Sequence, residues 1–487
     1  MAALRSNPKL YVAGRFVDGT GAGATPVVSP VTGQTLAELP DVGRADVDAA
    51  VAAARVAFDD YRHWTASERA QLCHRVARLI EADAAELARL TTLEQGKPYA
   101  AEAVVDVEDT AALFTDSAED AKRLFGEVIP STSRTKRMFT FRVPVGVWAA
   151  VTPWNFPLMI MTEFVAPALA TGNAVVAKPP GHTPLACLRL GELLTEAGVP
   201  EGLVSILPGD GPVGEQLVTH PGVDAIGFVG SSATAERIVR AAGLKRSIIE
   251  ASGNGPVVVL DDADLEHAAE AAVYGAYWNA GQVCCATERV LVQAEVHEEF
   301  VAAVLKARSA AVLGDPFDDA TTMGPLNNET SAAKMDRHVA DAVAQGASVL
   351  AGGARRAGMP TDLYYEFTVL DDVTPAMAVA REESFGPVLP IVPVAGGDDE
   401  LLRVANADPL GLQGAVFTSS LPRAFRFGEE LRCGSVVVND STDYFEGAQP
   451  FGGAAGSRTG WGRVGGLAQL RDMTDTRCMI VGLDRGM

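Results

Sequence analysis

Short apolar runs alternate with helix-like segments over a long part of the chain, from about residue 147 to residue 250. The apolar runs occupy residues 147–152, 174–178, 204–207, 225–229 and 247–250, and the helix-like segments lie between them at about 158–170, 183–197, 212–219 and 232–242. Such alternation predicts βαβ units, in which mostly parallel strands form one sheet covered by helices. A second alternating region runs from Gly255 to about residue 440. The expected fold class is therefore α/β, with two open α/β domains.

The segments outside these two regions follow other patterns. Residues 44–124 are rich in Ala and carry apolar residues at three- and four-residue spacing, which predicts helices. The stretch RMFTFRVPVGVW at residues 137–148 is rich in β-branched and aromatic residues, which suits strands. The glycine-dense stretch at residues 450–466 predicts a loop that approaches other groups closely. At 487 residues the chain is too long for one hydrophobic core, so two or three domains are expected.

Charge and composition disfavour several classes of function. The formal net charge is −22, and an acidic surface repels nucleic acid, so no such partner is expected. No run of about 18 apolar residues occurs, so no membrane span is expected. Residues 1–16 lack the apolar core of a secretory signal. The six cysteines include no CxxC pair, which disfavours a metal site and predicts a reducing, cytoplasmic setting.

Two glycine-containing segments could contact phosphate groups. Gly209, Gly211 and Gly214 match the GxGxxG pattern of a phosphate-binding turn, but the match is weak in a chain with 48 glycines. No acidic residue follows at the end of the next strand, which closes at Gly230. The segment FVGSS then puts Ser231 at the start of a helix, where it caps the helix or helps to hold an anion on free backbone amides.

Four polar side chains lie at positions where chemistry could occur. Asn155 follows the end of a strand. It is either a turn or helix-cap residue or a hydrogen-bond donor to a developing oxyanion. Glu250 ends another strand, either as an ordinary surface residue or as a general base. Cys284 and Cys285 are adjacent in YWNAGQVCCATERV. Free cysteines are usually buried, and neighbouring side chains point in different directions, so at most one of the two is expected to face a site.

In order and spacing, these segments resemble the aldehyde dehydrogenase superfamily over nearly the whole chain. The shared features are PWNFP, AKPP, FVGSS, Glu250 with its small-residue turn, NAGQVCCATER, EESFGPV and PFGG. Lys178 lies 23 residues after Asn155, and Cys284 lies 34 residues after Glu250, which is similar to the family's spacing. Seven such features in order outweigh the separate interpretations given above.

The resemblance implies a doubly wound, Rossmann-like cofactor domain, a doubly wound catalytic domain and a small β oligomerisation arm. The implied boundaries are 1–121 and 145–252 for the cofactor-binding domain, 253–448 for the catalytic domain, and 122–144 with 449–487 for the arm and C-terminal tail. An arm of this kind has unpaired strand edges, which a second subunit would pair. A homodimer or a homotetramer is therefore expected.

The resemblance also implies an activity, the NAD(P)-dependent oxidation of an aldehyde to its carboxylic acid. Cys284 would be the nucleophile that forms a thiohemiacetal and then a thioester, Glu250 the general base that activates water, and Asn155 an oxyanion donor. Cys285 keeps its interpretation as a packed thiol. The implied contacts with NAD or NADP come from Thr152, Trp154, Lys178, Gly181, Gly211, Gly230, Ser231, Glu383 and Phe385.

Among the departures of the sequence from the family pattern, two concern cofactor choice and proton transfer. Gly181 stands where the family often has a Glu, and a carboxylate there would repel a 2′-phosphate, so its absence makes NADP acceptable. The family's lysine eight to nine residues beyond the Asn motif is absent, because Glu163 and Phe164 occupy these positions. The details of proton transfer to and from the general base are therefore open.

The expected substrate follows from residues that align with the family's aldehyde tunnel. The aligned residues are Phe156, Trp278, Phe445 and Phe451, which favour an apolar or aromatic aldehyde, and Glu163, which is expected near the mouth and would disfavour anionic substrates. The alternative is a semialdehyde dehydrogenase acting on a small polar aldehyde. Two rivals are a CoA-acylating enzyme, which tends to lack the general-base Glu, and a cysteine hydrolase, which needs a His partner.

Overall fold

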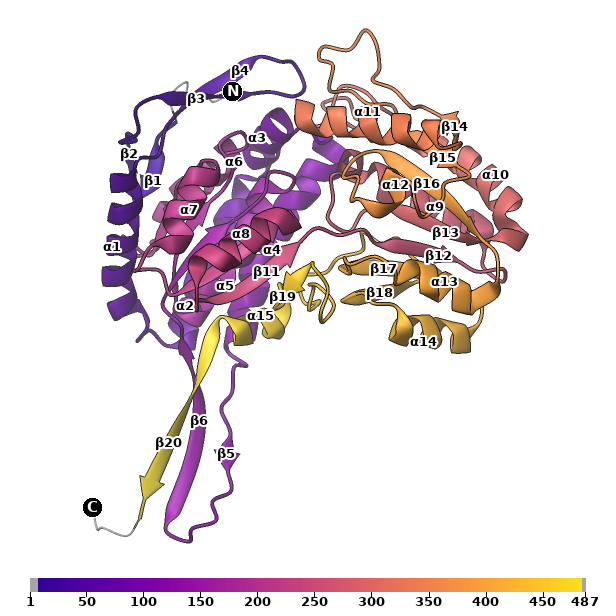
Figure 1. The fold of residues 1–487 in the computed structure, drawn as a ribbon. Helices are drawn as coiled ribbons and strands as arrows, with labels where there is room; N and C mark the ends of the chain where they lie inside the picture. The colour runs from indigo at the N-terminus through magenta and orange to yellow at the C-terminus, as the bar shows by residue number, and fades with distance from the viewer. Residues whose placement is uncertain (1–7, 484–487) are drawn as a thin grey trace.

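The computed structural model describes residues 8–483 and contains two large sheets that lie in separate lobes (Figure 1). The first is an eight-stranded sheet in the order β19-β11-β10-β7-β8-β9-β1-β2, in which the five strands from β11 to β9 are parallel. Every apolar run expected between residues 147 and 250 is one of these parallel strands. The strands are β1 (Leu10–Val12), β2 (Arg15–Val17), β7 (Val147–Val151), β8 (Ala174–Lys178), β9 (Val204–Ile206), β10 (Ala225–Gly230), β11 (Arg246–Ala251) and β19 (Gly460–Trp461).

Helices cover this sheet and account for the Ala-rich segment. A capping box starts one of them, α2, where the Thr65 hydroxyl accepts from the Glu68 amide and the Glu68 carboxylate accepts from the Thr65 amide. Helix α5 is buried almost all round, because it lies between the sheet and α4. These helices are α1 (Arg44–Tyr61), α2 (Ala66–Ala82), α3 (Ala84–Gln95), the π-helical turn η1 (Tyr99–Ala103), α4 (Val104–Ala121), α5 (Pro157–Thr171), α6 (Leu185–Glu196), α7 (Gly211–Thr219) and α8 (Ser232–Ala242).

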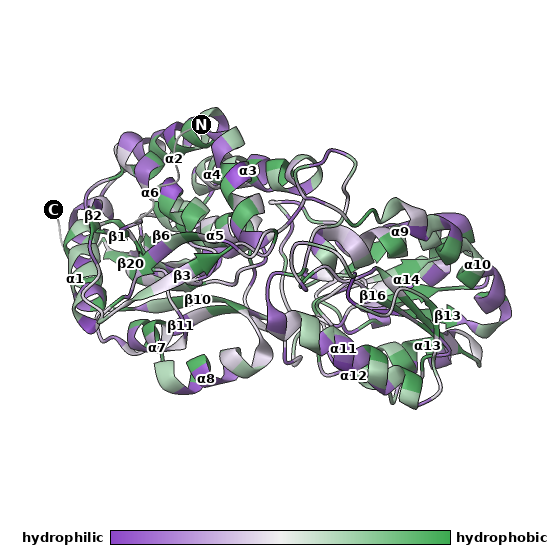
Figure 2. Cartoon of the chain, turned by 90° about the horizontal axis from the view of Figure 1, so that it is seen from above, coloured by the Kyte–Doolittle hydropathy of each residue, from purple (hydrophilic) through white to green (hydrophobic). Residues whose placement is uncertain are grey.

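The second sheet has seven strands in the order β14-β15-β16-β13-β12-β17-β18, all parallel except β14. Its strands are mostly hydrophobic, whereas its helices carry one polar face (Figure 2). The strands are β12 (Pro256–Val259), β13 (Arg289–Gln293), β14 (Ser348–Ala351), β15 (Thr368–Asp371), β16 (Val388–Val394), β17 (Gln413–Phe417) and β18 (Ser435–Val438). The helices are α9 (Leu265–Tyr277), η2 (Trp278–Gly281), η3 (Ala294–Val296), α10 (His297–Ala307), η4 (Arg308–Ala310), α11 (Glu329–Ala344), α12 (Ala378–Arg381), α13 (Gly397–Ala405) and α14 (Leu421–Glu430). The expected class, α/β with two open domains, is confirmed.

A third sheet projects from the first lobe as an arm (Figure 1). In it, β20 (Thr474–Gly482) pairs along its whole length with β6 (Lys136–Pro144), which also pairs with β5 (Val128–Ile129). Apolar side chains such as Ile480 and Val128 are exposed on the arm, and β20 has one unpaired edge. Elsewhere, β3 (Ala24–Val28) pairs with β4 (Thr35–Pro40), and α15 (Gly466–Asp472) precedes β20.

The expected domain boundaries and the oligomeric state stay predictions. Within the expected C-terminal tail, β19 joins the first sheet and only β20 joins the arm. Residues 1–7, which carry part of the expectation of no secretory signal, and residues 484–487 of the tail lie outside the described part of the chain. Between residues 8 and 483, no helix combines the length and the apolar character that crossing a bilayer requires.

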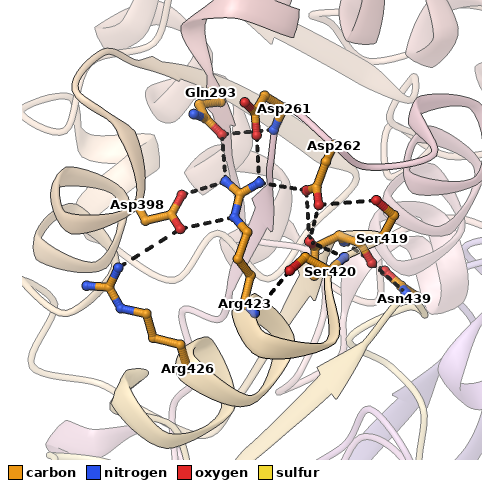
Figure 3. A network of polar contacts seen from close by, with 10 residues as sticks. Asp261, Asp262, Gln293, Asp398, Ser419, Ser420, Arg423, Arg426 and Asn439 are labelled. Atoms are coloured by element: carbon orange, nitrogen blue, oxygen red, sulfur yellow. Dashed lines mark hydrogen bonds and ion pairs between the residues drawn. The ribbon is translucent and has the colours of Figure 1, made fainter.

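In the second lobe, a polar network links the loops that follow the strands to helices α13 and α14 (Figure 3). The guanidinium of Arg423 on α14 bonds to Asp261 and Asp262, which follow β12, and to Asp398 at the start of α13. The hydroxyl of Thr418 also donates to Asp262, and the Thr418 backbone exchanges two hydrogen bonds with the side chain of Asn439. Asn439 directly follows β18, so the network fixes the point from which residues 440–445 leave the sheet.

A tight turn after β11 joins the two sheets. The amide of Gly253 donates to Glu383 Oε1 at 2.9 Å. A Cβ on residue 253 would lie 2.0 Å from the Cys284 carbonyl oxygen, and a Cβ on Gly255 would lie 2.1 Å from that of Gln413. Only glycine permits this approach, so the turn can bring the end of β11 against the segment that carries Cys284.

Gly253→Ala is expected to destabilise the protein by about 1–3 kcal/mol, because the added methyl group forces the Cys284 backbone to move. The melting temperature should fall by several degrees in thermal unfolding. Gly428→Ala is the matched control, since a Cβ there has no atom within 4 Å and the residue lies inside α14. Equal melting temperatures for Gly253→Ala and the parent protein would contradict the close contact.

Candidate active site

Cys284 lies in an irregular segment between η2 and β13, with its side chain partly exposed, while Cys285 is buried. Asn279, Ala280 and Gly281 all have positive φ angles, of 49°, 52° and 70°. Three consecutive left-handed residues tighten the chain just before the thiol, and two of them are not glycine. Cys284 is thus the more accessible of the two thiols, whereas Cys285 packs into the core and only borders the first cavity.

A buried hydrogen-bond network holds this strained segment. Asn279 Nδ2 donates to the Asn155 carbonyl oxygen at 3.0 Å, and its Oδ1 accepts from Gln95 Nε2 at 2.9 Å. Its backbone amide donates to Glu102 Oε1 at 3.0 Å. Gln282 Oε1 accepts from the Asn327 amide at 2.8 Å. Sequence reasoning missed these residues, because their partners are far away in the chain and no local pattern marks them.

Asn155 does not cap a helix, since Phe156 is the N-cap residue of α5. Its side chain is buried, and Nδ2 donates to the Gln282 carbonyl oxygen at 2.9 Å. Its Oδ1 has no hydrogen-bond partner among the described residues. The amide therefore points towards the Cys284 segment rather than along the helix, and Nδ2 carries a second hydrogen.

Glu250 and Cys284 lie next to each other in a dry environment. Burial raises the pKa of Glu250 to about 7, an effect that its hydrogen bond with Cys284 opposes. The contact with Cys285, burial and the Glu250 carboxyl together raise the pKa of the Cys284 thiol well above its usual value. Glu250 Oε1 has no partner within residues 8–483. The thiol is neutral at rest and has a titratable carboxyl beside it.

The first cavity at this site has a volume of about 340 Å³ and ends at Cys284 and Glu250. All five residues expected in the substrate tunnel line it: Phe156, Glu163, Trp278, Phe445 and Phe451. The expected position of Glu163 is wrong, because its side chain is only 4% exposed and contributes to the inner wall. Burial, and secondly Glu250, raise its pKa well above the usual value, which favours the neutral form of this carboxyl over the charged one.

The outer part of this cavity carries residues that sequence reasoning missed. Asp109 on α4 and Asp440 after β18 are exposed, and Asp443 is half-buried. Asp106 also lines the cavity but forms an ion pair with the buried Lys97. The local patterns offered no signal, because acidic residues on a helix face or in a turn are normally only solvated.

The second cavity lies on the other side of Cys284 and has a volume of about 320 Å³. Five residues expected at the cofactor line it: Trp154, Gly230, Ser231, Glu383 and Phe385. The Glu288 carboxylate accepts hydrogen bonds from the backbone amides of Ser384 and Phe385 at 2.7 and 2.9 Å. These two bonds hold Phe385 at a φ of 57°, and its ring centroid lies 5.5 Å from that of Trp154. Ser231 also accepts from the Thr234 amide, so the capping interpretation is correct for this residue.

The other residues expected at the cofactor lie at the same edge of the sheet but do not line this cavity. They are Thr152, Lys178, Gly181 and Gly211. Lys178 Nζ donates to the Gly209 carbonyl oxygen at 2.6 Å, and burial lowers its pKa to about 8. A Cβ on Gly181 would lie 3.9 Å from a carboxylate oxygen of Asp210, so an acidic group from another loop is near this position. Buried Thr152 Oγ1 has no partner in residues 8–483 and is available to a ligand.

No group of three His, Cys, Asp or Glu side chains within residues 8–483 is arranged to hold a metal ion. The site is instead built from a thiol, a buried carboxyl and an amide, located where the carboxyl ends of parallel strands meet the second lobe.

Fold and site together define a class, the α/β enzymes in which two cavities at the carboxyl ends of parallel strands meet at one cysteine and one carboxyl. The chain belongs to the aldehyde dehydrogenase family, whose model matches residues 16–479. The resemblance stated from the sequence is therefore confirmed.

Several relatives are similar to this chain over almost their whole length. The succinate-semialdehyde dehydrogenase [NADP(+)] of Escherichia coli is 37% identical, with 96% of this chain and 97% of that protein covered. The glutarate-semialdehyde dehydrogenase of Pseudomonas aeruginosa is 36% identical, with 97% of each covered. A solved structure of an indole-3-acetaldehyde dehydrogenase in complex with NAD⁺ matches with a TM-score of 0.95 and 35% identity, covering 99% of this chain and 97% of that one.

Glu250→Gln is expected to change how stability depends on pH. The carboxyl has a pKa of about 7 in the fold against about 4.5 when exposed, so the folded state binds more protons between these values. The Glu250 carboxyl therefore lowers the free energy of unfolding more and more as pH rises from about 4.5 to 7. Above pH 7 the loss reaches about 3 kcal/mol. The gain in melting temperature of the variant over the parent should grow through the same window.

Thermal unfolding at a series of pH values checks this expectation. Glu108→Gln, on the exposed face of α4, is the control for removing a carboxyl from a solvated position. A pH-independent difference for Glu250→Gln would show that the carboxyl titrates as an exposed group.

Proposed function

We propose that this protein oxidises an aldehyde to its carboxylic acid with NAD or NADP as the electron acceptor. One observation carries the proposal: Cys284 and Glu250 line both cavities, so substrate and cofactor would meet at the same thiol and carboxyl. The family membership of the chain supports the same activity.

The first step is addition of the thiol to the carbonyl carbon. Glu250 interacts with the Cys284 thiol and, when ionised, is suited to accept its proton as the C–S bond forms. The product is a thiohemiacetal with an oxyanion. The second hydrogen of Asn155 Nδ2 and the backbone amide of Cys284 are suited to bind that oxygen. Asn279 positions Asn155 through the backbone carbonyl.

Oxidation and hydrolysis then follow at the same carbon. A bound nicotinamide would supply the redox step by accepting a hydride, which leaves a thioester on Cys284. Glu250 releases to solvent the proton that it took from the thiol. In its ionised form it then removes a proton from water, whose oxygen attacks the thioester, and it returns this proton to the departing thiolate as the acid is released. Because the pKa of Glu250 is about 7, both of its protonation states are available near neutral pH.

The residues around the second cavity fit a dinucleotide. Glu383 offers a partly buried carboxyl for ribose hydroxyls, and the start of α8 at Ser231 offers the positive end of a helix for phosphate oxygens. Lys178, Gly181 and Gly211 would surround the adenosine end. One relative is named for NADP(+) and one solved relative holds NAD⁺, which supports use of NAD or NADP without choosing between them.

The relatives favour a small polar aldehyde over the apolar or aromatic aldehyde expected from the tunnel aromatics, because two of them are named for semialdehydes. The rival functions find less support. Glu250 argues against transfer of the acyl group to CoA, and no histidine within residues 8–483 lines either cavity as a hydrolase partner of the thiol. The unpaired arm edge supports assembly into a homodimer or homotetramer.

Cys284→Ala is expected to lower aldehyde oxidation by more than roughly a thousandfold, because no other group can form the thioester. Cys285→Ala, the matched control, should retain most of the activity, since its thiol is buried. The assay follows NAD(P)H absorbance over a panel of aldehydes. Comparable losses in the two variants would overturn the assignment, and absence of any oxidation by the parent protein would overturn the function.

Gly181→Glu is expected to reduce kcat/KM with NADP by roughly tenfold while affecting NAD much less, because a second carboxylate beside Asp210 would repel the 2′-phosphate. Gly181→Gln separates charge from size and should leave the ratio of the two values almost unchanged. Steady-state kinetics with both cofactors measure this ratio. An unchanged ratio in Gly181→Glu would show that residue 181 is remote from the ribose.

A further inference from the structure

The substrate cavity contains an excess of acidic groups. Six carboxyl side chains line it, and no Lys, Arg or His does among the residues that the structure describes; the six are Asp106, Asp109, Glu163, Glu250, Asp440 and Asp443. Glu163 and Glu250 form the reactive end, where burial raises the pKa of Glu163 well above its usual value. Asp106 is compensated by Lys97. Burial also raises the pKa values of Asp109 and Asp443, but not well above the usual range, so we expect the uncompensated negative charge in the outer half of the cavity.

Asp109, Asp440 and Asp443 make up this outer acidic group. Within residues 8–483, no Lys, Arg or His forms an ion pair with any of the three. Asp109 comes from α4 in the first lobe, whereas the other two come from the segment after β18 in the second. Charges from both lobes thus converge on one cavity instead of pairing with nearby cations.

The position of Asp443 is fixed by the backbone around it. Gln413 Nε2 donates to the carbonyl oxygens of Thr442 at 2.6 Å and Tyr444 at 2.8 Å, on either side of Asp443. The Arg423 network and Asn439 anchor the start of the same segment (Figure 3). Asp443 Oδ1 lies 3.6 Å from the place of a Cβ on Gly275 of α9, so a larger residue there would crowd the carboxylate. The carboxylate is therefore held in place at the cavity wall.

Aromatic rings surround the acidic group. Tyr274 and Trp278 lie 5.3 Å apart at 44°, and Phe445 and Phe451 lie 5.5 Å apart at 90°. All four rings line the cavity. Aromatic faces attract ammonium groups, most strongly where a carboxylate is close and water is partly excluded. At the inner end, the nine-tenths buried and unpartnered Glu250 Oε1 marks where the reacting part of a ligand belongs.

We propose that the substrate is an aldehyde with a cationic group at the far end of a short chain, such as an ω-amino or ω-trimethylammonio aldehyde. This inference rests on the proposed function and specifies the substrate class of the same cavity. The carbonyl carbon reacts at Cys284, and the ammonium group lies between Asp443 and the Tyr274–Trp278 pair. An acid semialdehyde of the kind named for the relatives would instead bring a carboxylate against Asp443 and Asp109.

The test compares three aldehydes on the full-length protein. These are 4-(trimethylammonio)butanal, its uncharged isostere 5,5-dimethylhexanal, and succinic semialdehyde. The cation should have a kcat/KM at least roughly tenfold above that of the isostere and of the acid. If the isostere is oxidised and the kcat/KM for the cation is equal to or lower than that for the isostere, the inference is overturned and the proposed function stays intact.

Substitutions of single aspartates test which carboxylates recognise the cationic group. Asp443→Asn should lower the ratio of kcat/KM for the cation to that for the isostere by roughly tenfold, and Asp109→Asn by a smaller factor, because Asp109 is more exposed. Glu196→Gln, an exposed position on α6 outside the cavity, is the charge-matched control and should leave the ratio unchanged. An equal fall in Glu196→Gln and Asp443→Asn would overturn the inference, since it would reflect the general field of the protein.

A binding measurement avoids turnover altogether. Calorimetry with n-butyltrimethylammonium should detect binding to the parent protein and severalfold weaker binding to Asp443→Asn, with melting temperatures checking that both are folded. Absence of binding to the folded parent would overturn the inference. Binding of the cation by a parent that oxidises no aldehyde would support the cation site and overturn the proposed function.

Discussion

The close approach of two backbone segments at Gly253 is the contact on which the rest of the site depends. The turn that joins the two sheets passes so near the Cys284 carbonyl that no side chain fits. It brings the end of β11, with Glu250, against the segment that carries the thiol, and its Gly253 amide binds Glu383. The residues proposed to act in catalysis, to bind the cofactor and to bind the substrate are thus positioned by one short turn.

Exclusion of water sets the electrostatics around that turn. The Glu250 and Glu163 carboxyls lose hydration without gaining a cation, so their pKa values rise. The pKa of the Cys284 thiol rises first through its contact with Cys285 and then through burial. Farther out, Asp109 and Asp440 keep contact with solvent. One cavity therefore changes from a neutral inner end, suited to nucleophilic addition, to an acidic outer half, suited to recognising charge.

Local patterns predicted much of the architecture. Apolar runs bounded by helix-like segments became β7 to β11, since both the strand period and the burial of parallel sheets are encoded over a few residues. The prediction for Glu163 failed because the surroundings of this side chain are formed by segments that are distant in the sequence. Glu163 lies on a helix that is buried on almost all sides, a fact that depends on α4 and the sheet rather than on its neighbours in sequence. The roles of Asp109 and Asp443 depend on a meeting of the two lobes.

The sequence by itself determined the order of the elements, the family and the chemical types present: a pair of adjacent thiols, a carboxyl at a strand end and an amide before a helix. Only the tertiary structure decided which cysteine is accessible, which carboxyls are neutral and which keep their charge. The physical reason is that hydration and electrostatic interaction depend on all the atoms within a few ångströms, and these come from segments that are hundreds of residues apart.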